Sequence, residues 1–178
     1  MLKARDFYNY DNERFSPLRD PARDVVAAYQ TAARFLDTVQ ESLLIEHGLA
    51  FTADIIHNLA HEMPKRFDRF GDMLHERHLM VEYPATPELA ERIDAPEKAF
   101  EIVIGVLDEI QEALEKFRMV TDNAQFRPMA LQAEEMMLQN SSDYTLILEM
   151  WVMWDESTSK TSFDSWAKKM GKRGGADD

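Results

Sequence analysis

The chain has 178 residues, 45% of them hydrophobic and 30% charged, which is enough for one domain with a buried core. Its formal net charge of −13 argues against a general nucleic-acid-binding surface. The absence of cysteine excludes disulfides, thiolate zinc sites and cysteine nucleophiles, so the strong metal ligands of this chain are histidine, aspartate and glutamate.

An irregular N-terminal arm is expected over residues 1–20, where aromatic and charged residues alternate without a helical period. Asp20 followed by Pro21 is a favourable helix start, because aspartate caps the first amides and proline suits the first helical position. Apolar residues then recur every three or four positions, which predicts a long first helix. Gly48 is expected to end it in the left-handed conformation.

A second helix is predicted to contain residues 55–78, a short step after the first. A proline-containing connection follows, and a third helix is predicted from Pro96 to about Val120. The fourth opens at Arg127, which is followed by a proline. Residues 140–143, Asn-Ser-Ser-Asp, either lie inside this fourth helix or cap a further one.

A C-terminal extension is expected over residues 157–178, with Phe163 and Trp166 docked on the bundle and a frayed tail after them. The four helices would form the bundle itself, over residues 21–156. Their short, long and short connections are similar to those of ferritin-like proteins. The predicted fold is therefore all-α, a ferritin-like four-helix bundle with a long crossover between its second and third helices.

Targeting features are absent from the sequence. The N-terminal segment lacks the apolar core of a signal peptide, and no uninterrupted apolar run approaches the roughly 18 residues of a membrane span. We therefore expect a cytoplasmic protein without a membrane partner.

The second predicted helix holds four of the five histidines of the chain. At about 100° per residue, one stripe of this helix collects the following ligand-type side chains: His57, His61, Asp68, Asp72, His75 and Glu76. Iron and similar metals accept neutral imidazole together with carboxylate oxygens, and two histidines on consecutive turns can reach one ion. The stripe therefore indicates either a metal site or a polar helix face.

The pattern His57-x3-His61-x10-Asp72-x3-Glu76, with Arg77 directly after it, resembles the second-helix motif of the Dps-like mini-ferritins. The agreement in spacing covers this helix, whereas the other helices resemble that family only in length and order. One difference is that His61 stands where the family usually has a carboxylate.

The resemblance implies an iron site at a two-fold subunit interface, with histidines from one subunit and carboxylates from the other. The implied metal ligands are His47, His57, His61, Asp72 and Glu76. In that family a further histidine ends the first helix. His47 is its nearest counterpart here and stands two residues after the corresponding position. The resemblance also implies Fe(II) oxidation by peroxide or oxygen, iron storage, and roles in iron homeostasis and oxidative stress. The implied assembly is a homodimer at minimum and a dodecamer if a cage forms, with zinc as a substitute metal.

Two other interpretations stay open. In the first, the protein is a non-enzymatic helical dimer or interaction module whose histidine-rich helix is an interface. In the second, a di-metal carboxylate oxidase site lies inside one subunit, which requires Glu-x-x-His motifs on two helices. Asp72-x-x-His75 is a partial match to that motif, but no histidine follows His78 to supply the second copy.

The basic segment KKMGKR, residues 168–173, resembles the tails with which some Dps proteins bind DNA. It is short and belongs to a chain with a net charge of −13, so we do not expect DNA as a partner.

Overall fold

The computed structural model describes residues 15–77, 79, 83–89, 92–124 and 126–174. Most of the predicted N-terminal arm lies outside these residues. The elements follow in the order η1 (Ser16–Leu18), α2 (Arg19–Ile45), α3 (Ala50–His75), α4 (Pro96–Asn123), α5 (Arg127–Glu156) and α6 (Lys160–Gly174). None of the helices in the described ranges is long and apolar enough to cross a membrane.

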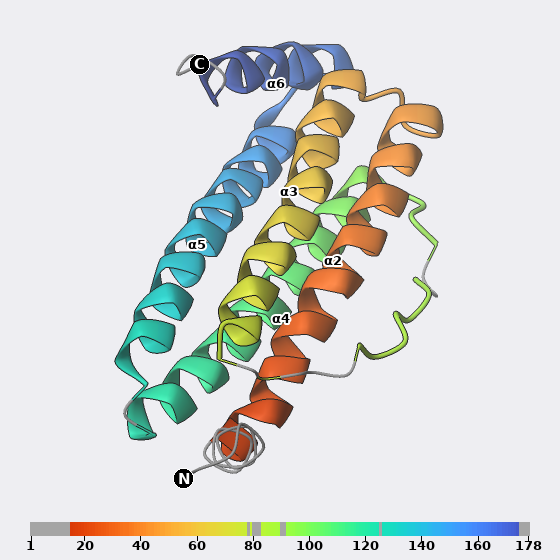
Figure 1. The fold of residues 1–178 in the computed structure, drawn as a ribbon. Coiled ribbons are helices and arrows are strands. Elements are labelled where there is room, and N and C mark those ends of the chain that lie inside the picture. Colours follow the sequence, from red (N-terminus) through yellow and green to blue (C-terminus); the bar gives the residue numbers. More distant parts are fainter. Residues whose placement is uncertain (1–14, 78, 80–82, 90–91, 125, 175–178) are drawn as a thin grey trace, which may run out of the picture.

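Helices α2 to α5 form a four-helix bundle, and α6 lies across one end of it (Figure 1). α2 and α3 form one antiparallel hairpin, α4 and α5 form a second, and α2 also packs along α4. In the connection after α3, residues 83–89 lie on the outside of the bundle, and α4 begins at the end where α3 begins (Figure 1). The predicted all-α bundle with one long crossover is confirmed.

The inner faces of the helices meet in one apolar core. Its buried side chains follow the three-to-four-residue spacing that predicted the helices. Phe70 of α3 and Phe117 of α4 pack edge to face, with 5.0 Å between their ring centroids. Burying a side chain of this size contributes about 2 kcal/mol.

The first helix differs from the prediction at its start and agrees with it at its end. α2 begins at Arg19, slightly earlier than predicted, because the η1 turn leads directly into it and buries Leu18. After its C-terminus Gly48 has a φ of 68°. The Leu49 amide then donates to the Leu43 carbonyl over 2.9 Å, which completes the glycine-terminated helix end that was predicted.

Both α3 and α5 continue through residues that could have interrupted them. Pro64 lies inside α3 with an exposed side chain. Residues 140–143 lie inside α5, where Asn140 is buried and its Nδ2 donates to the Leu107 carbonyl of α4 over 2.8 Å. The structure therefore contains one long fourth helix, because the polar side chain in its middle finds a partner on α4.

An apolar contact docks α6 on the bundle. Phe163 is fully buried, and its ring lies 5.2 Å from that of Trp154 on α5, measured between centroids. The predicted docking of Phe163 is confirmed. The helix then continues to Gly174, and residues 175–178 of the predicted tail lie outside the described residues.

A polar contact adds to this docking. The Asp164 carboxylate accepts hydrogen bonds from the backbone amides of Phe51 and Thr52, over 3.1 and 3.0 Å. These amides belong to the first turn of α3, which has no side-chain cap of its own. The carboxylate of α6 thus caps the positive end of another helix.

Candidate metal centre

The predicted ligand stripe lies on the outer surface of α3. His57, His61, Asp72 and Glu76 are all exposed, as are Lys65, Asp68 and His75. The opposite face of α3 carries the buried side chains Ile56, Leu59, Met63, Phe70 and Leu74. The stripe is therefore directed away from the core, and a ligand reaches it from solvent or from another molecule.

His57 and His61 form the first half of the predicted site. Their imidazole rings meet edge to face, with 4.3 Å between centroids and an interplanar angle of 82°. The two residues occupy consecutive turns of α3, so both rings can turn toward one ion in front of the helix. A transition metal bound there would take two nitrogen ligands from this chain and its other ligands from elsewhere.

Asp72 and Glu76 form a second pair, one turn apart at the other end of the stripe. Asp72 lies in the last turn of α3, and Glu76 is its C-cap residue. A helix rises about 1.5 Å per residue, so Asp72 lies about 16 Å along the axis from His61. One ion cannot span that distance. Accordingly, the described part of the chain holds no group of three or more His, Asp or Glu residues that could bind a metal.

The order of side chains along the stripe is mirrored about a point between Arg66 and Phe67. Three side chains with nitrogen groups precede that point and three carboxylates follow it at matching distances: His57, His61 and Lys65, then Asp68, Asp72 and Glu76. His75 is the exception, because its mirrored position is Asn58. A second α3, antiparallel and related by a two-fold axis through this point, would set each nitrogen group against a carboxylate. Lys65 was not among the side chains predicted to form the stripe, although the mirrored spacing is visible once the whole stripe is known to be exposed.

His47 lies apart from the stripe. It follows α2 at the end of the bundle, and its Nε2 is 3.2 Å from the Ile93 carbonyl oxygen at the end of the crossover. The Ser42 hydroxyl approaches the same carbonyl oxygen at 3.5 Å. The structure thus brings His47 to the crossover and not to His57 and His61.

The interior of the bundle contains no buried carboxylate among the described residues. The buried polar side chains there are Thr31, Thr52, Thr121 and Asn140. Asp72 and His75, which partly matched the motif for a site inside one subunit, are both exposed. The described residues therefore give no support to a di-metal carboxylate oxidase site inside one subunit, because none of the buried polar side chains is a carboxylate or a histidine.

Polar side chains join α3 to α5 beside the stripe. Arg69 Nη2 lies 2.6 Å from Glu135 Oε2, and this hydrogen bond lowers the pKa of the Glu135 carboxyl. Deeper in, burial raises the pKa of the Tyr29 phenol well above its ordinary value, an effect that the charge of Arg66 opposes. Tyr29 is therefore a neutral phenol at physiological pH.

A cleft of about 610 Å³ opens between α3, α5 and α6 next to the first half of the stripe. Ile55, Leu146 and Met170 give it an apolar side, while His61 and Lys65 lie at its polar side. His61 therefore borders both the open surface of α3 and a concave space large enough for several water molecules.

Solved structures with a similar fold are ferritins. Apo-ferritin from Pseudo-nitzschia multiseries matches with a TM-score of 0.77 and 14% identity, over 85% of this chain and 97% of that chain. A PmFTN variant soaked in iron matches with a TM-score of 0.75 and 15% identity, over 83% of this chain and 95% of that chain. The predicted ferritin-like fold is confirmed. No protein-family model and no curated protein sequence matches the chain.

Proposed function

We propose, from the ferritin-like fold and the mirrored stripe on α3, that this protein binds iron between two copies of its chain and oxidises Fe(II) there. Each of two equivalent sites would consist of His57 and His61 of one copy with Asp72 and Glu76 of the other. The observation that carries the proposal is the exposure of all four side chains as two separate half-sites on one helix face. We leave His47 out of the proposed site, because its Nε2 lies 3.2 Å from the Ile93 carbonyl oxygen in the crossover.

The donor atoms of such a site suit iron. Two carboxylates balance the charge of a divalent ion, and two neutral imidazoles complete a set of nitrogen and oxygen ligands that leaves positions open for water and an oxidant. The net charge of −13 also favours the approach of cations. The ligands of each half-site are exposed on the surface of one chain and form a complete site only with the second copy. Pairing and metal binding would therefore reinforce each other.

Iron is the substrate in this proposal, with peroxide or oxygen as the oxidant. Two Fe(II) ions each give up one electron, and these electrons with two protons from solvent reduce one hydrogen peroxide to two water molecules. The role of the protein is to hold the ions, and the cleft beside His61 gives the oxidant a path to one side of the site. Storage of the ferric product requires a closed shell, for which the Dps-like dodecamer is the proposed assembly. The proposed setting is cytoplasmic iron homeostasis.

Calorimetric titration under anaerobic conditions tests the site directly, with Fe(II) as the substrate and Zn(II) as a redox-inactive probe. The wild type and His47→Ala are expected to bind one ion per chain. The variant His57→Ala/His61→Ala is expected to lose about tenfold or more in affinity, as when ligand geometry is disrupted. Equal binding by all three proteins, or none by the wild type, would contradict the proposed site.

A metal-free helical dimer is the second candidate function, and the matching positions of Lys65 and Asp68 favour it. These two side chains would pair across the same two-fold axis without any metal. Light scattering in the presence of a chelator and then of Zn(II) separates the candidates. A dimer under both conditions that Asp68→Lys dissociates, with no heat of metal binding, supports the α3 interface alone; a mass that rises with Zn(II) supports the metal site.

A further inference from the structure

Helix α5 exposes an unusual number of apolar side chains. Eight large hydrophobic side chains are exposed among the described residues, and four of them lie on α5: Leu131, Leu138, Leu148 and Val152. Leu138 is 73% exposed. A single exposed leucine needs no explanation, but several on one helix mark an interaction surface.

Three of these residues have the spacing of a coiled-coil seam. Leu131, Leu138 and Val152 lie at multiples of seven residues along α5, and Thr145 occupies the remaining place in the row. We call these four residues the α5 seam. The side chains that α5 buries in its own bundle lie on the opposite face, namely Met129, Ala133, Met136, Ile147 and Met150. A seven-residue repeat keeps the seam on one line, along which a second helix can pack.

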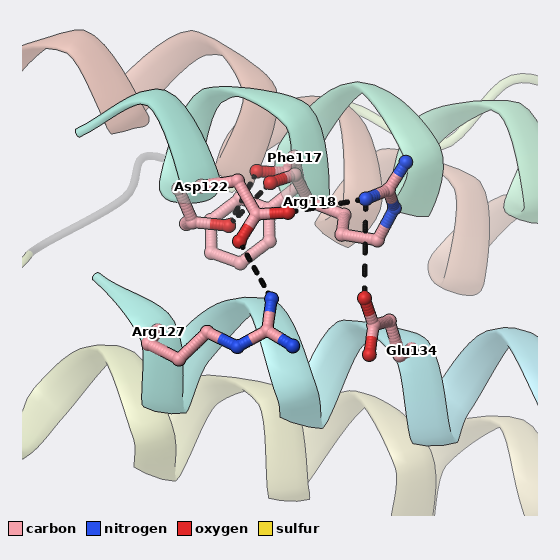
Figure 2. A network of polar contacts seen from close by, with 6 residues as sticks. Phe117, Arg118, Asp122, Arg127 and Glu134 are labelled. Atoms are coloured by element: carbon pink, nitrogen blue, oxygen red, sulfur yellow. Dashed lines mark hydrogen bonds and ion pairs between the residues drawn. The ribbon is translucent and has the colours of Figure 1, made fainter. Parts of the chain in front are cut away.

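Two glutamates beside the seam are held against neighbouring helices. Glu135 Oε2 lies 2.6 Å from Arg69 Nη2 of α3, and Glu134 Oε1 lies 3.9 Å from Arg118 Nη1 of α4. Figure 2 shows the Arg118 guanidinium facing Glu134 across the space between the two helices. Arginines of α3 and α4 thus accompany these two carboxylates, although Arg118 Nη1 lies closer to Asp122 Oδ2, at 3.1 Å. Glu149 is a further exposed carboxylate beside the seam.

The seam is self-complementary in shape. Its midpoint lies between Ser141 and Ser142, two small exposed residues. Leu131 and Val152 lie at equal distances from that point, and so do Leu138 and Thr145. Each leucine is thus matched with a smaller, β-branched residue. Two antiparallel copies would therefore place large side chains against small ones on both sides of the axis, while the central serines allow the helices to approach closely.

The ends of α5 are complementary in charge about the same midpoint. Arg127 is the first residue of the helix and Glu156 is the last. The Arg127 side chain is 62% exposed and its Nη1 lies 3.0 Å from Asp122 Oδ1 (Figure 2). An antiparallel arrangement would bring each Arg127 to Glu156 of the other copy, whereas a parallel one would bring like charges together.

We propose that a second copy of this chain packs antiparallel along the α5 seam, about a two-fold axis between Ser141 and Ser142. Glu134 then comes opposite Glu149 of the second copy, and the charge of Arg118 beside Glu134 offsets their repulsion. This contact needs no metal. It uses a different helix from the proposed iron site, and its test in the presence of chelator does not depend on metal binding.

Sedimentation equilibrium of the full chain, with chelator present, tests the contact. Leu138→Glu places a charge in the seam, and it is expected to halve the mass observed for the wild type. Met119→Glu is the matched control, because Met119 is 53% exposed on α4, away from the seam. It is expected to leave the mass unchanged. A wild-type mass that Leu138→Glu does not lower, with helicity by circular dichroism unchanged, would overturn the proposal.

Cysteine cross-linking tests the register, since the chain has no cysteine of its own. The variant Leu138→Cys/Thr145→Cys is expected to form a disulfide-linked dimer on oxidation with diamide, because the two positions face each other across the axis. Within one chain the two cysteines lie two helical turns apart, a distance of about 10 Å, so they cannot form a disulfide with each other. Leu138→Cys alone is expected to cross-link poorly. Equal cross-linking by the single and double variants would overturn the antiparallel register.

Discussion

Arg66 on α3 and Asp143 on α5 form an ion pair, with 2.5 Å between Nη1 and Oδ2, and their side chains are only 14% and 20% exposed. The pair lies close to the buried phenol of Tyr29. It joins α3 to α5, whereas α3 packs mainly against α2.

Removing one partner of this pair is expected to destabilise the fold. Asp143→Ala leaves the Arg66 charge partly buried without compensation, which costs about 3 kcal/mol. The exposed pair of Arg34 and Glu88 is the control, because Glu88→Ala there is expected to cost at most about 0.5 kcal/mol. Urea unfolding followed by circular dichroism measures both. Similar losses for the two variants would show that the Arg66 pair does not hold α3 to α5.

The Asp164 carboxylate is expected to stabilise the joint between α6 and α3. Asp164→Ala removes the acceptor for the first amides of α3 and is expected to cost about 1 kcal/mol. Asp164→Asn keeps one acceptor oxygen and is expected to recover part of that loss. Tryptophan fluorescence reports the change, since Trp154 and Trp166 both lie next to Phe163. An alanine variant with wild-type stability would contradict the role of the cap.

Two glycines are expected to respond to alanine in opposite directions. Gly48 has a φ of 68°, so Gly48→Ala is expected to cost about 1 kcal/mol although nothing lies within 4 Å of an added Cβ. Gly105 lies inside α4 with equally open space around it, so Gly105→Ala is expected to stabilise by up to about 1 kcal/mol. Thermal unfolding measures both, and a shift of the same sign in both variants would contradict this account.

The pKa of Glu135 is expected to depend on Arg69. The hydrogen bond from Arg69 lowers that pKa in the folded state, so the pair stabilises the fold above the pKa that Glu135 has in the unfolded chain. This stabilisation is lost as the pH falls through the lower, folded pKa. An NMR titration of the Glu135 carboxyl is expected to show its pKa rising in Arg69→Ala. An unchanged Glu135 pKa in Arg69→Ala would show that a group other than Arg69 lowers it.

The sequence was sufficient to predict most of the fold. The starts at Pro96 and Arg127 and the helix end at Gly48 rest on local rules, since proline favours a first turn and glycine the left-handed conformation. The continuity of α5 could not be predicted, because the amide of Asn140 finds its partner on α4, far away in the sequence.

The candidate site also combines features that local sequence patterns predict with features that depend on distant residues. Helical spacing placed the two histidines and the two carboxylates on one face correctly, because that depends only on the period of the helix. The separation of His47 from that face depends on its contact with Ile93 in the crossover, whose path no local pattern specifies. Local patterns also do not identify what covers an exposed face, because a partner molecule is not encoded in the helical period.

Complementation between two defective variants tests the inter-subunit iron site most directly. His57→Ala/His61→Ala lacks one half-site and Asp72→Asn/Glu76→Gln lacks the other, so neither is expected to bind metal alone. When equal amounts of the two variants exchange subunits, half of the dimers contain one chain of each kind. In such a dimer one of the two sites has both histidines and both carboxylates, and the other has neither pair. The account predicts Zn(II) binding by the mixture at about a quarter of the wild-type stoichiometry. No binding by the exchanged mixture, or wild-type binding by either variant alone, would contradict it.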